Sequence, residues 1–165
     1  MQKVTVSNRV GLAVGLAMLL MAGCSHHKGE GTKIAVGDVP GSVITAMNAR
    51  LPGAQIRSVE REKEGGNIVY DLELSQGGRK YEMDIKEDGT VLEIEKEVAS
   101  AEVPQAVAQA VRAKYPDATI KEVMEVNIVK AGQETPDHYE VVMMSASGKE
   151  KEVTVSLDGK RITEE

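Results

Sequence analysis

The sequence predicts an α+β fold built from two tandem repeats, each a helix followed by four antiparallel strands. The segment that begins with Val39 and Pro40 recurs 64 residues later at Val103 and Pro104, which indicates an internal duplication. Within each copy the spacing of apolar residues changes from the 3.6-residue period of a helix to the two-residue period of strands. Pairs of turn-forming residues between the alternating segments then predict hairpins.

The chain begins with the features of an export signal that ends at its only cysteine, Cys24. Lys3 and Arg9 precede an apolar stretch over 10–22, and small residues come directly before the cysteine, as in a cleaved signal peptide over 1–23. The 13 apolar-stretch residues are too few for the roughly 20 of a membrane-spanning helix. This region resembles bacterial lipoprotein signals, which implies a diacylglycerol and acyl chains such as palmitate on Cys24.

The lipoprotein resemblance also implies an extracytoplasmic, membrane-anchored protein. Ser25 resembles the residue that releases such proteins toward the outer membrane, which places this one on its periplasmic side if the organism is Gram-negative. Residues 24–38 are rich in Gly, Lys and His, and they predict a flexible tether. His26 and His27 lie in that segment without a third ligand, so we expect no metal site there.

The composition excludes nucleic-acid binding. The formal net charge is −6, and removal of Lys3 and Arg9 with the signal takes it to −8. The chain has no tryptophan and no phenylalanine, and its only aromatic residues are four tyrosines. It therefore lacks both the positive field and the stacking surfaces that nucleic-acid binders use.

The first repeat is predicted over 39–98. Four apolar residues are spaced as on one face of a helix: Val43, Ile44, Met47 and Leu51. Apolar and charged residues then alternate over 68–75 and 80–86, as in half-buried strands. Turn residues separate these segments at Gly65–Gly66, Gly77–Gly78 and Asp88–Gly89.

The second repeat is predicted over 103–165 and follows the same order. Its helix carries Val107, Ala110 and Val111 at helical spacing, and Pro116 ends it. The distance between equivalent residues grows from 64 to 69 at Tyr70 and Tyr139. The first hairpin of this repeat is therefore expected to be longer, with the extra residues near 130–137.

Three short motifs occur in both copies: a proline after the helix, a strand led by tyrosine, and a hairpin closed by Asp-Gly. In these motifs the chain resembles the PepSY-like group, whose fold is likened to the beta-lactamase inhibitory protein (BLIP). The resemblance covers both repeats, from Val39 to the C-terminus. It implies a secreted or periplasmic module, often a lipoprotein, with helices packed on one face of an antiparallel sheet and the other face open. Protease inhibition is inferred for PepSY domains and beta-lactamase inhibition for the distant relative BLIP, and the family brings no catalytic residues to this chain.

The open face of the first repeat is predicted to carry opposed carboxylates. With two-residue turns at Gly77–Gly78 and Asp88–Gly89, apolar residues pair on the core side, for example Ile85 with Leu92. The other side then carries six carboxylates in two rows: Asp71, Asp84 and Glu93, and beside them Glu73, Glu82 and Glu95. Like charges placed directly opposite destabilise a sheet by about 0.2–1 kcal/mol per pair, so a purely structural sheet gains nothing from them.

We hypothesise that this face binds a cationic partner, such as a basic protein or peptide segment, in an inhibitor-like way. Two alternatives stay open. A charged open face often serves only solubility, which would fit a structural or stress-related envelope lipoprotein with no dedicated ligand. The second alternative is a cation (calcium) buffer or sensor. The register of 55–63 is also open, so either Arg57 and Arg61 or Glu60 and Glu62 border the rows.

No enzyme activity and no cofactor are expected. The chain has no glycine-rich phosphate loop after a strand, and His138, which stands alone before a strand, is expected to be solvated. Residues 84–95 match several positions of a calcium-binding loop, but Lys86 occupies a ligand position and the flanking segments alternate as strands. An EF-hand is therefore rejected.

Overall fold

The structure is a computed structural model that describes residues 31–164. The predictions for the signal peptide, for Cys24 and for His26 and His27 lie outside these residues. None of the helices in residues 31–164 is long and apolar enough to cross a membrane.

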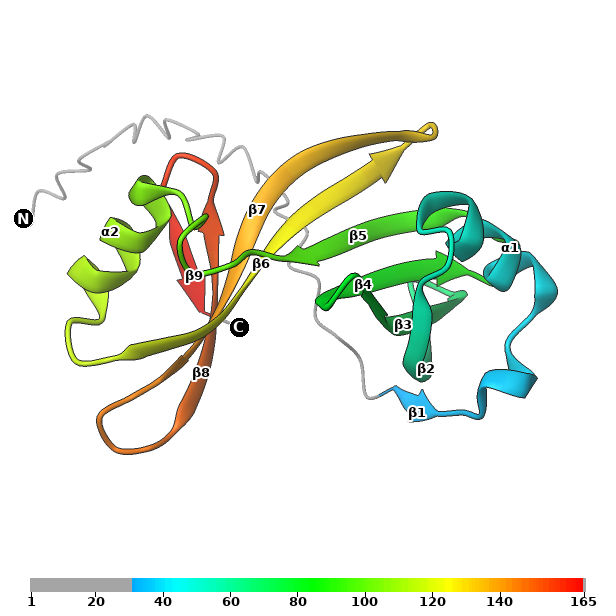
Figure 1. Ribbon diagram of the computed structural model, residues 1–165, viewed down its shortest axis with the longest axis horizontal. Helices are drawn as coiled ribbons and strands as arrows, with labels where there is room; N and C mark the ends of the chain where they lie inside the picture. Colours follow the sequence, from blue (N-terminus) through cyan, green and yellow to red (C-terminus); the bar gives the residue numbers. More distant parts are fainter. Residues whose placement is uncertain (1–30, 165) are drawn as a thin grey trace, which may run out of the picture.

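The described chain forms two α-helices and nine strands in a strictly sequential order (Figure 1). The elements are β1 (Thr32–Lys33), the 3₁₀ turn η1 (Val36–Asp38), α1 (Gly41–Arg50), β2 (Gln55–Glu64), β3 (Asn67–Gln76), β4 (Arg79–Lys86), β5 (Val91–Glu97), α2 (Gln105–Lys114), β6 (Thr119–Lys130), β7 (Gln133–Met144), β8 (Glu150–Ser156) and β9 (Ile162–Glu164). The helix and four strands expected for each repeat are therefore α1 with β2–β5 and α2 with β6–β9.

All nine strands belong to one antiparallel sheet in the order β1 to β9. The two repeats meet where β5 pairs with β6, with Glu95 opposite Val126. The sequence did not determine this pairing. Two separate sheets, one for each repeat, would show the same local patterns as one continuous sheet. Figure 1 shows the sheet strongly twisted, so that α1 with β2–β5 and α2 with β8–β9 lie at opposite ends of the molecule.

Each helix packs on its own hydrophobic core. Val43 and Met47 of α1 lie in a cluster with buried residues of β2–β5 such as Leu72. Val107 and Val111 of α2 lie in a second cluster with buried residues of β6–β8. Helices of ten residues are marginal alone in water, so burial of these side chains, worth about 1.5–3 kcal/mol each, stabilises them.

The ordered body begins before Val39, where the composition predicted the flexible tether to end. Thr32 and Lys33 form β1, which pairs with Arg61 and Glu60 of β2. Ile34 packs against the first core. The tether prediction is therefore wrong for 32–38, because two backbone pairings and one apolar side chain attach this polar segment to the sheet.

The pairing of Ile85 with Leu92 is also wrong. A β-bulge shifts the register after Asp84, so Ile85 lies opposite Val91 and Leu92 is the extra residue. The bulge lets Val91 pack in the first core. It leaves the predicted pairs of Asp84 with Glu93 and of Glu82 with Glu95 in register.

The longer first hairpin of the second repeat is confirmed. β6 and β7 have 12 residues each, against ten each in β2 and β3, and Lys130 pairs with Gln133 at the turn. A bulge at Asp137 lies beside Pro136, a position where a strand tolerates the missing proline N–H. Val129 of this hairpin packs against the first core.

Candidate functional site

The structure brings the six predicted carboxylates together on adjacent strands. Asp84 of β4 lies opposite Asp71 of β3 and Glu93 of β5. Glu82 lies opposite Glu73 and Glu95 in the same way. The Gly77–Gly78 turn sets this register, because both glycines have positive φ, as the tight hairpin requires.

The register of β2 decides whether glutamates or arginines border the carboxylate rows. Glu60 lies opposite Asp71 and extends the first row to four carboxylates, whereas Glu62 lies opposite Val69 and Arg61 opposite Tyr70. We call the surface that carries Glu60, Asp71, Glu73, Glu82, Asp84, Glu93 and Glu95 the acidic face. Lys33 of β1 lies at its outer edge, with Nζ 3.9 Å from Glu60 Oε1.

The acidic face is not evenly exposed to water. Glu93 and Glu95 are only 4% exposed, whereas Asp71, Glu73, Glu82 and Asp84 are half-buried. Next to Glu95, Val126 and Met124 of β6 are buried as well. Burial of a carboxylate costs hydration free energy unless other groups compensate it, so Glu93 and Glu95 lie where the sheet is least accessible to water.

A lysine limits the acidic face at one end. Lys80 Nζ lies 2.8 Å from Glu82 Oε1 and 3.0 Å from Glu122 Oε1. Partial burial opposes the charged form, but the hydrogen bonds and charges of these two carboxylates raise the pKa of Lys80 above its usual value. Glu73, which lies opposite Glu82, accepts a hydrogen bond of 2.7 Å at Oε2 from Ser58 Oγ.

The acidic face continues into the second repeat through His138, which the sequence predicted to be solvated. Its side chain is only 16% exposed, with Nδ1 2.9 Å from Asp137 Oδ2 and Nε2 3.5 Å from Glu140 Oε1. Burial alone would lower the pKa of His138, but hydrogen bonds to Glu140 and Asp137, with the charge of Glu93, raise it. The prediction was wrong because Glu93 approaches His138 only through the β5–β6 pairing, which no local pattern reveals.

The described residues hold no group of three or more His, Cys, Asp and Glu side chains positioned for a metal ion. Residues 84–95 form the end of β4, a turn and β5, which is a β-hairpin and not the helix–loop–helix of an EF-hand.

Two helix-plus-four-strand units in one antiparallel sheet define a duplicated α+β fold, and similarity to known proteins gives its family. The sequence matches the family described as "Putative beta-lactamase-inhibitor-like, PepSY-like" over residues 26–93 and 69–162. The chain belongs to this family. The two matches overlap over 69–93, so the predicted repeat boundaries of 39–98 and 103–165 rest on the sequence pattern.

Solved structures of Bacteroides proteins share the fold. A DUF2874 family protein of Bacteroides uniformis matches with a TM-score of 0.58 and 18% identity, over 76% of this chain and 88% of that one. A Bacteroides eggerthii structure described as "putative periplasmic proteins" gives 0.59 and 17%, over 76% and 88%. A DUF2874 family protein of Bacteroides ovatus gives 0.56 and 15%, over 78% and 89%. No curated protein matches the chain.

Proposed function

We propose that the protein is a lipid-anchored, extracytoplasmic binding module that holds a basic segment of another protein on its acidic face. The observation that carries this proposal is the register of β3, β4 and β5, which sets carboxylates directly opposite one another in two adjacent rows. The fold likeness to a protein described as periplasmic agrees with the location, and the signal-like sequence before Cys24 supports the anchor.

The energetics of the sheet favour a cationic ligand. Each of the four opposed pairs, Asp71 with Asp84, Asp84 with Glu93, Glu73 with Glu82 and Glu82 with Glu95, costs the sheet about 0.2–1 kcal/mol. The negative charge of the two rows attracts a ligand that carries ammonium or guanidinium groups.

Aromatic side chains and helices both lie away from the acidic face. Tyr70 of β3 and Tyr139 of β7 are buried in the two cores, so binding depends on charge more than on aromatic anchors. We further infer that both helices lie on the opposite face, because Ile94 of the first core faces Asn127, and Val123 of the second core lies four residues before Asn127 on β6. An even spacing keeps both on one side of the sheet.

A titration of the lipid-free mature protein with the peptide acetyl-(Lys-Ser)₃-amide tests the proposal. We expect binding that weakens as salt is raised from low concentration, since salt screens charges beyond about 8–10 Å at 0.1–0.15 M. The double charge reversal Glu82→Lys with Asp84→Lys should abolish it. The matched control is Asp117→Lys with Glu150→Lys, which changes net charge equally at exposed positions away from the acidic face.

The same experiment separates the alternatives. An absence of binding, or an equal loss in the control variant, overturns the proposal and favours a structural envelope lipoprotein. A rise in melting temperature with calcium, together with no response to the peptide, favours the cation buffer or sensor. Any inhibitor-like action on an enzyme would follow from binding and requires the partner to be isolated first.

A further inference from the structure

A β-bulge in β2 brings Arg57 to the side of the sheet that carries the acidic face. Ile56 pairs with Leu74 and Ser58 pairs with Glu73, so Arg57 is the extra residue. Strict alternation from the buried Val59 would direct Arg57 toward the core and Ile56 away from it. The bulge instead lets Ile56 pack against the first core, and Arg57 Nε donates a hydrogen bond of 2.8 Å to Ser75 Oγ.

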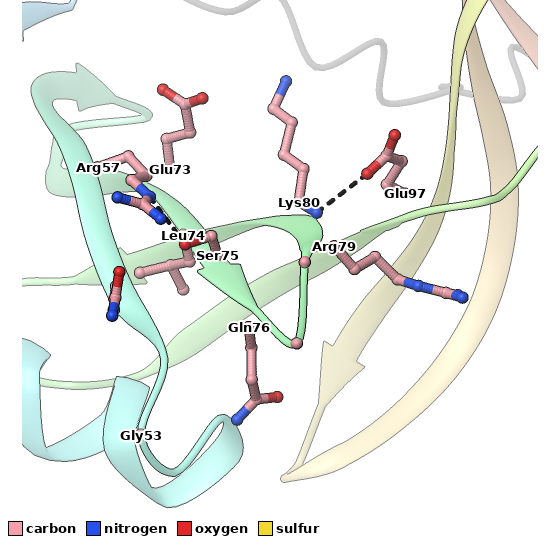
Figure 2. Close-up of a pocket in the computed structure, with 12 residues that line it drawn as sticks. Gly53, Arg57, Glu73, Leu74, Ser75, Gln76, Arg79, Lys80 and Glu97 are labelled. Atoms are coloured by element: carbon pink, nitrogen blue, oxygen red, sulfur yellow. Dashed lines mark hydrogen bonds between the residues drawn. The ribbon is translucent and has the colours of Figure 1, made fainter.

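Arg57 lines a shallow hollow next to the second row of carboxylates. The hollow has a volume of ≈ 660 Å³ and lies at the turn between β3 and β4. Its polar lining includes Gln55, Arg57, Glu73, Ser75, Lys80 and Glu97. Figure 2 shows the side chains of Glu73, Lys80 and Glu97 extending from the sheet to the same side, and Arg79 directed away from Arg57.

The other charged groups of the hollow already have partners. Lys80 Nζ is held by Glu82 and Glu122, and Arg79 Nη2 lies 3.3 Å from Glu102 Oε2. The two carboxylates accept hydrogen bonds, Glu73 from Ser58 and Glu97 from the backbone N–H of Lys80 at 3.1 Å.

Arg57 differs from these groups. It is exposed, and within residues 31–164 its only side-chain hydrogen bond is the one from Nε to Ser75 Oγ. Nη1 and Nη2 therefore remain to bind a planar acceptor, and a carboxylate matches their geometry with two parallel hydrogen bonds. The bulge and the Ser75 contact hold the guanidinium in place before any ligand arrives.

We infer that the Arg57 hollow binds a carboxylate of the same partner segment whose basic residues lie on the acidic face. This inference rests on the proposed function. Arg57 directly precedes Ser58 on β2, and Ser58 donates a hydrogen bond to Glu73 of the acidic face, so one extended segment can reach both. The ligand then carries basic residues followed by a carboxylate, either an Asp side chain or the end of a chain, as in Lys-x-Lys-x-Asp.

Three peptides of this pattern test the inference: acetyl-Lys-Ser-Lys-Ser-Asp-amide, its Asn-amide counterpart, and acetyl-Lys-Ser-Lys-Ser-Gly with a free C-terminal carboxylate. A partly exposed arginine–carboxylate pair should make the Asp peptide bind about three- to tenfold more tightly than the Asn peptide. Arg57→Gln should remove that difference. The Gly peptide shows whether a chain end serves as well as a side chain.

The control is Arg112→Gln, which removes an exposed arginine of α2 and should leave the preference for Asp intact. Equal affinity for the Asp and Asn peptides, or a preference that survives Arg57→Gln, overturns the inference while leaving the proposed function in place. If no basic peptide binds at all, the proposed function fails. The hollow is then tested by titrating acetyl-aspartate amide while the NMR signal of the Arg57 Nε–H is followed, and an unmoved signal overturns the inference on its own.

Discussion

Arg50 at the end of α1 donates a hydrogen bond from Nη2 to the carbonyl oxygen of Gly132, at a distance of 3.0 Å. Gly132 lies at the tip of the β6–β7 hairpin, so this bond joins the helix of the first repeat to a loop of the second. Glu134 of the same hairpin lies 3.9 Å from Arg50 Nη1, and Val129 packs against the first core. The extended hairpin therefore links the two repeats beyond the β5–β6 pairing, which ends at Ile128.

Arg50→Ala should destabilise the protein by about 0.5–1.5 kcal/mol, the usual net contribution of a hydrogen bond with a weak ion pair beside it. A urea unfolding curve followed by circular dichroism measures the change. Arg112→Ala, which removes an exposed arginine of α2, should shift the midpoint much less. Equal shifts in the two variants would show that the hairpin contact contributes nothing to stability.

The Asp-Gly turn of each repeat contacts the first turn of its own helix at equivalent positions. A Cβ atom on Gly159 would lie 2.5 Å from the carbonyl oxygen of Ala106, and one on Gly89 would lie 3.0 Å from that of Ser42. Ser42 and Ala106 are 64 residues apart, as the repeat requires. The glycine of this motif therefore serves close packing of the turn on the helix as well as the turn itself.

Gly159→Ala should consequently cost more than an alanine in a turn without such a neighbour. The matched control is Gly148→Ala, since Gly148 also has positive φ (76°, against 70° for Gly159), but a Cβ atom there would meet no other atom within 4 Å. We expect about 1–2 kcal/mol for the control, from the left-handed backbone alone. The Gly159 variant should lose at least about 1 kcal/mol more through overpacking, as measured by thermal or urea unfolding.

His138 should make stability depend on pH. Burial opposes the charged imidazole, but Glu140, Asp137 and Glu93 together raise the pKa of His138 above 6.5 in the folded protein, so folding favours the protonated form. Its contribution is therefore fully present below pH 6.5 and is lost as the pH rises through the folded-state pKa. Ser156 of β8 and Val126 of β6, which lie opposite His138, carry no titrating group.

Unfolding curves of the wild type and His138→Gln between about pH 5.5 and 8.5 test this sign. The wild type should be more stable than the variant at the acidic end, and the gap should narrow toward the alkaline end. A gap that is constant across the range would mean that the imidazole stabilises only through packing. A gap that widens with pH would mean that the neutral ring is the favoured form.

Cys24→Ser should release the protein from the membrane without altering its fold. The thiol is the predicted attachment point of the lipid, and Cys24 lies outside the described residues 31–164. Fractionation of cells, with labelled palmitate as a second readout, measures the loss of membrane retention. Retention of the Cys24→Ser variant in the membrane fraction would contradict the lipoprotein prediction.

The parts of the fold that local patterns determine were predictable. Gly77–Gly78 fixes the β3–β4 register through a two-residue turn, so the pairs Asp71 with Asp84 and Glu73 with Glu82 followed directly and are confirmed. The Asp88–Gly89 hairpin was predicted only in part, because the bulge that moves Leu92 out of register depends on how Val91 fits the core.

The parts that depend on distant contacts were not predictable. Without the bulge at Arg57, alternation along β2 would direct Arg57 toward the core and Ile56 away from it. The bulge reverses this, and the packing of Ile56 on the first core favours it. Likewise, nothing near His138 in the sequence indicates Glu93, which reaches it across β6. The candidate site is therefore a product of sheet pairing, although each of its strands could be recognised alone.

If Cys24 carries the predicted lipid, the short strand β1 limits how far the first repeat lies from the membrane. Thr32 follows the predicted lipid attachment at Cys24 by eight residues, and eight residues span at most about 29 Å. Because β1 is bonded to the outer strand of the first repeat, the repeat with the carboxylates is the one kept near the lipid. If Cys24 carries the predicted lipid, a partner of the proposed acidic face would meet it close to the bilayer, which favours proteins embedded in the same membrane.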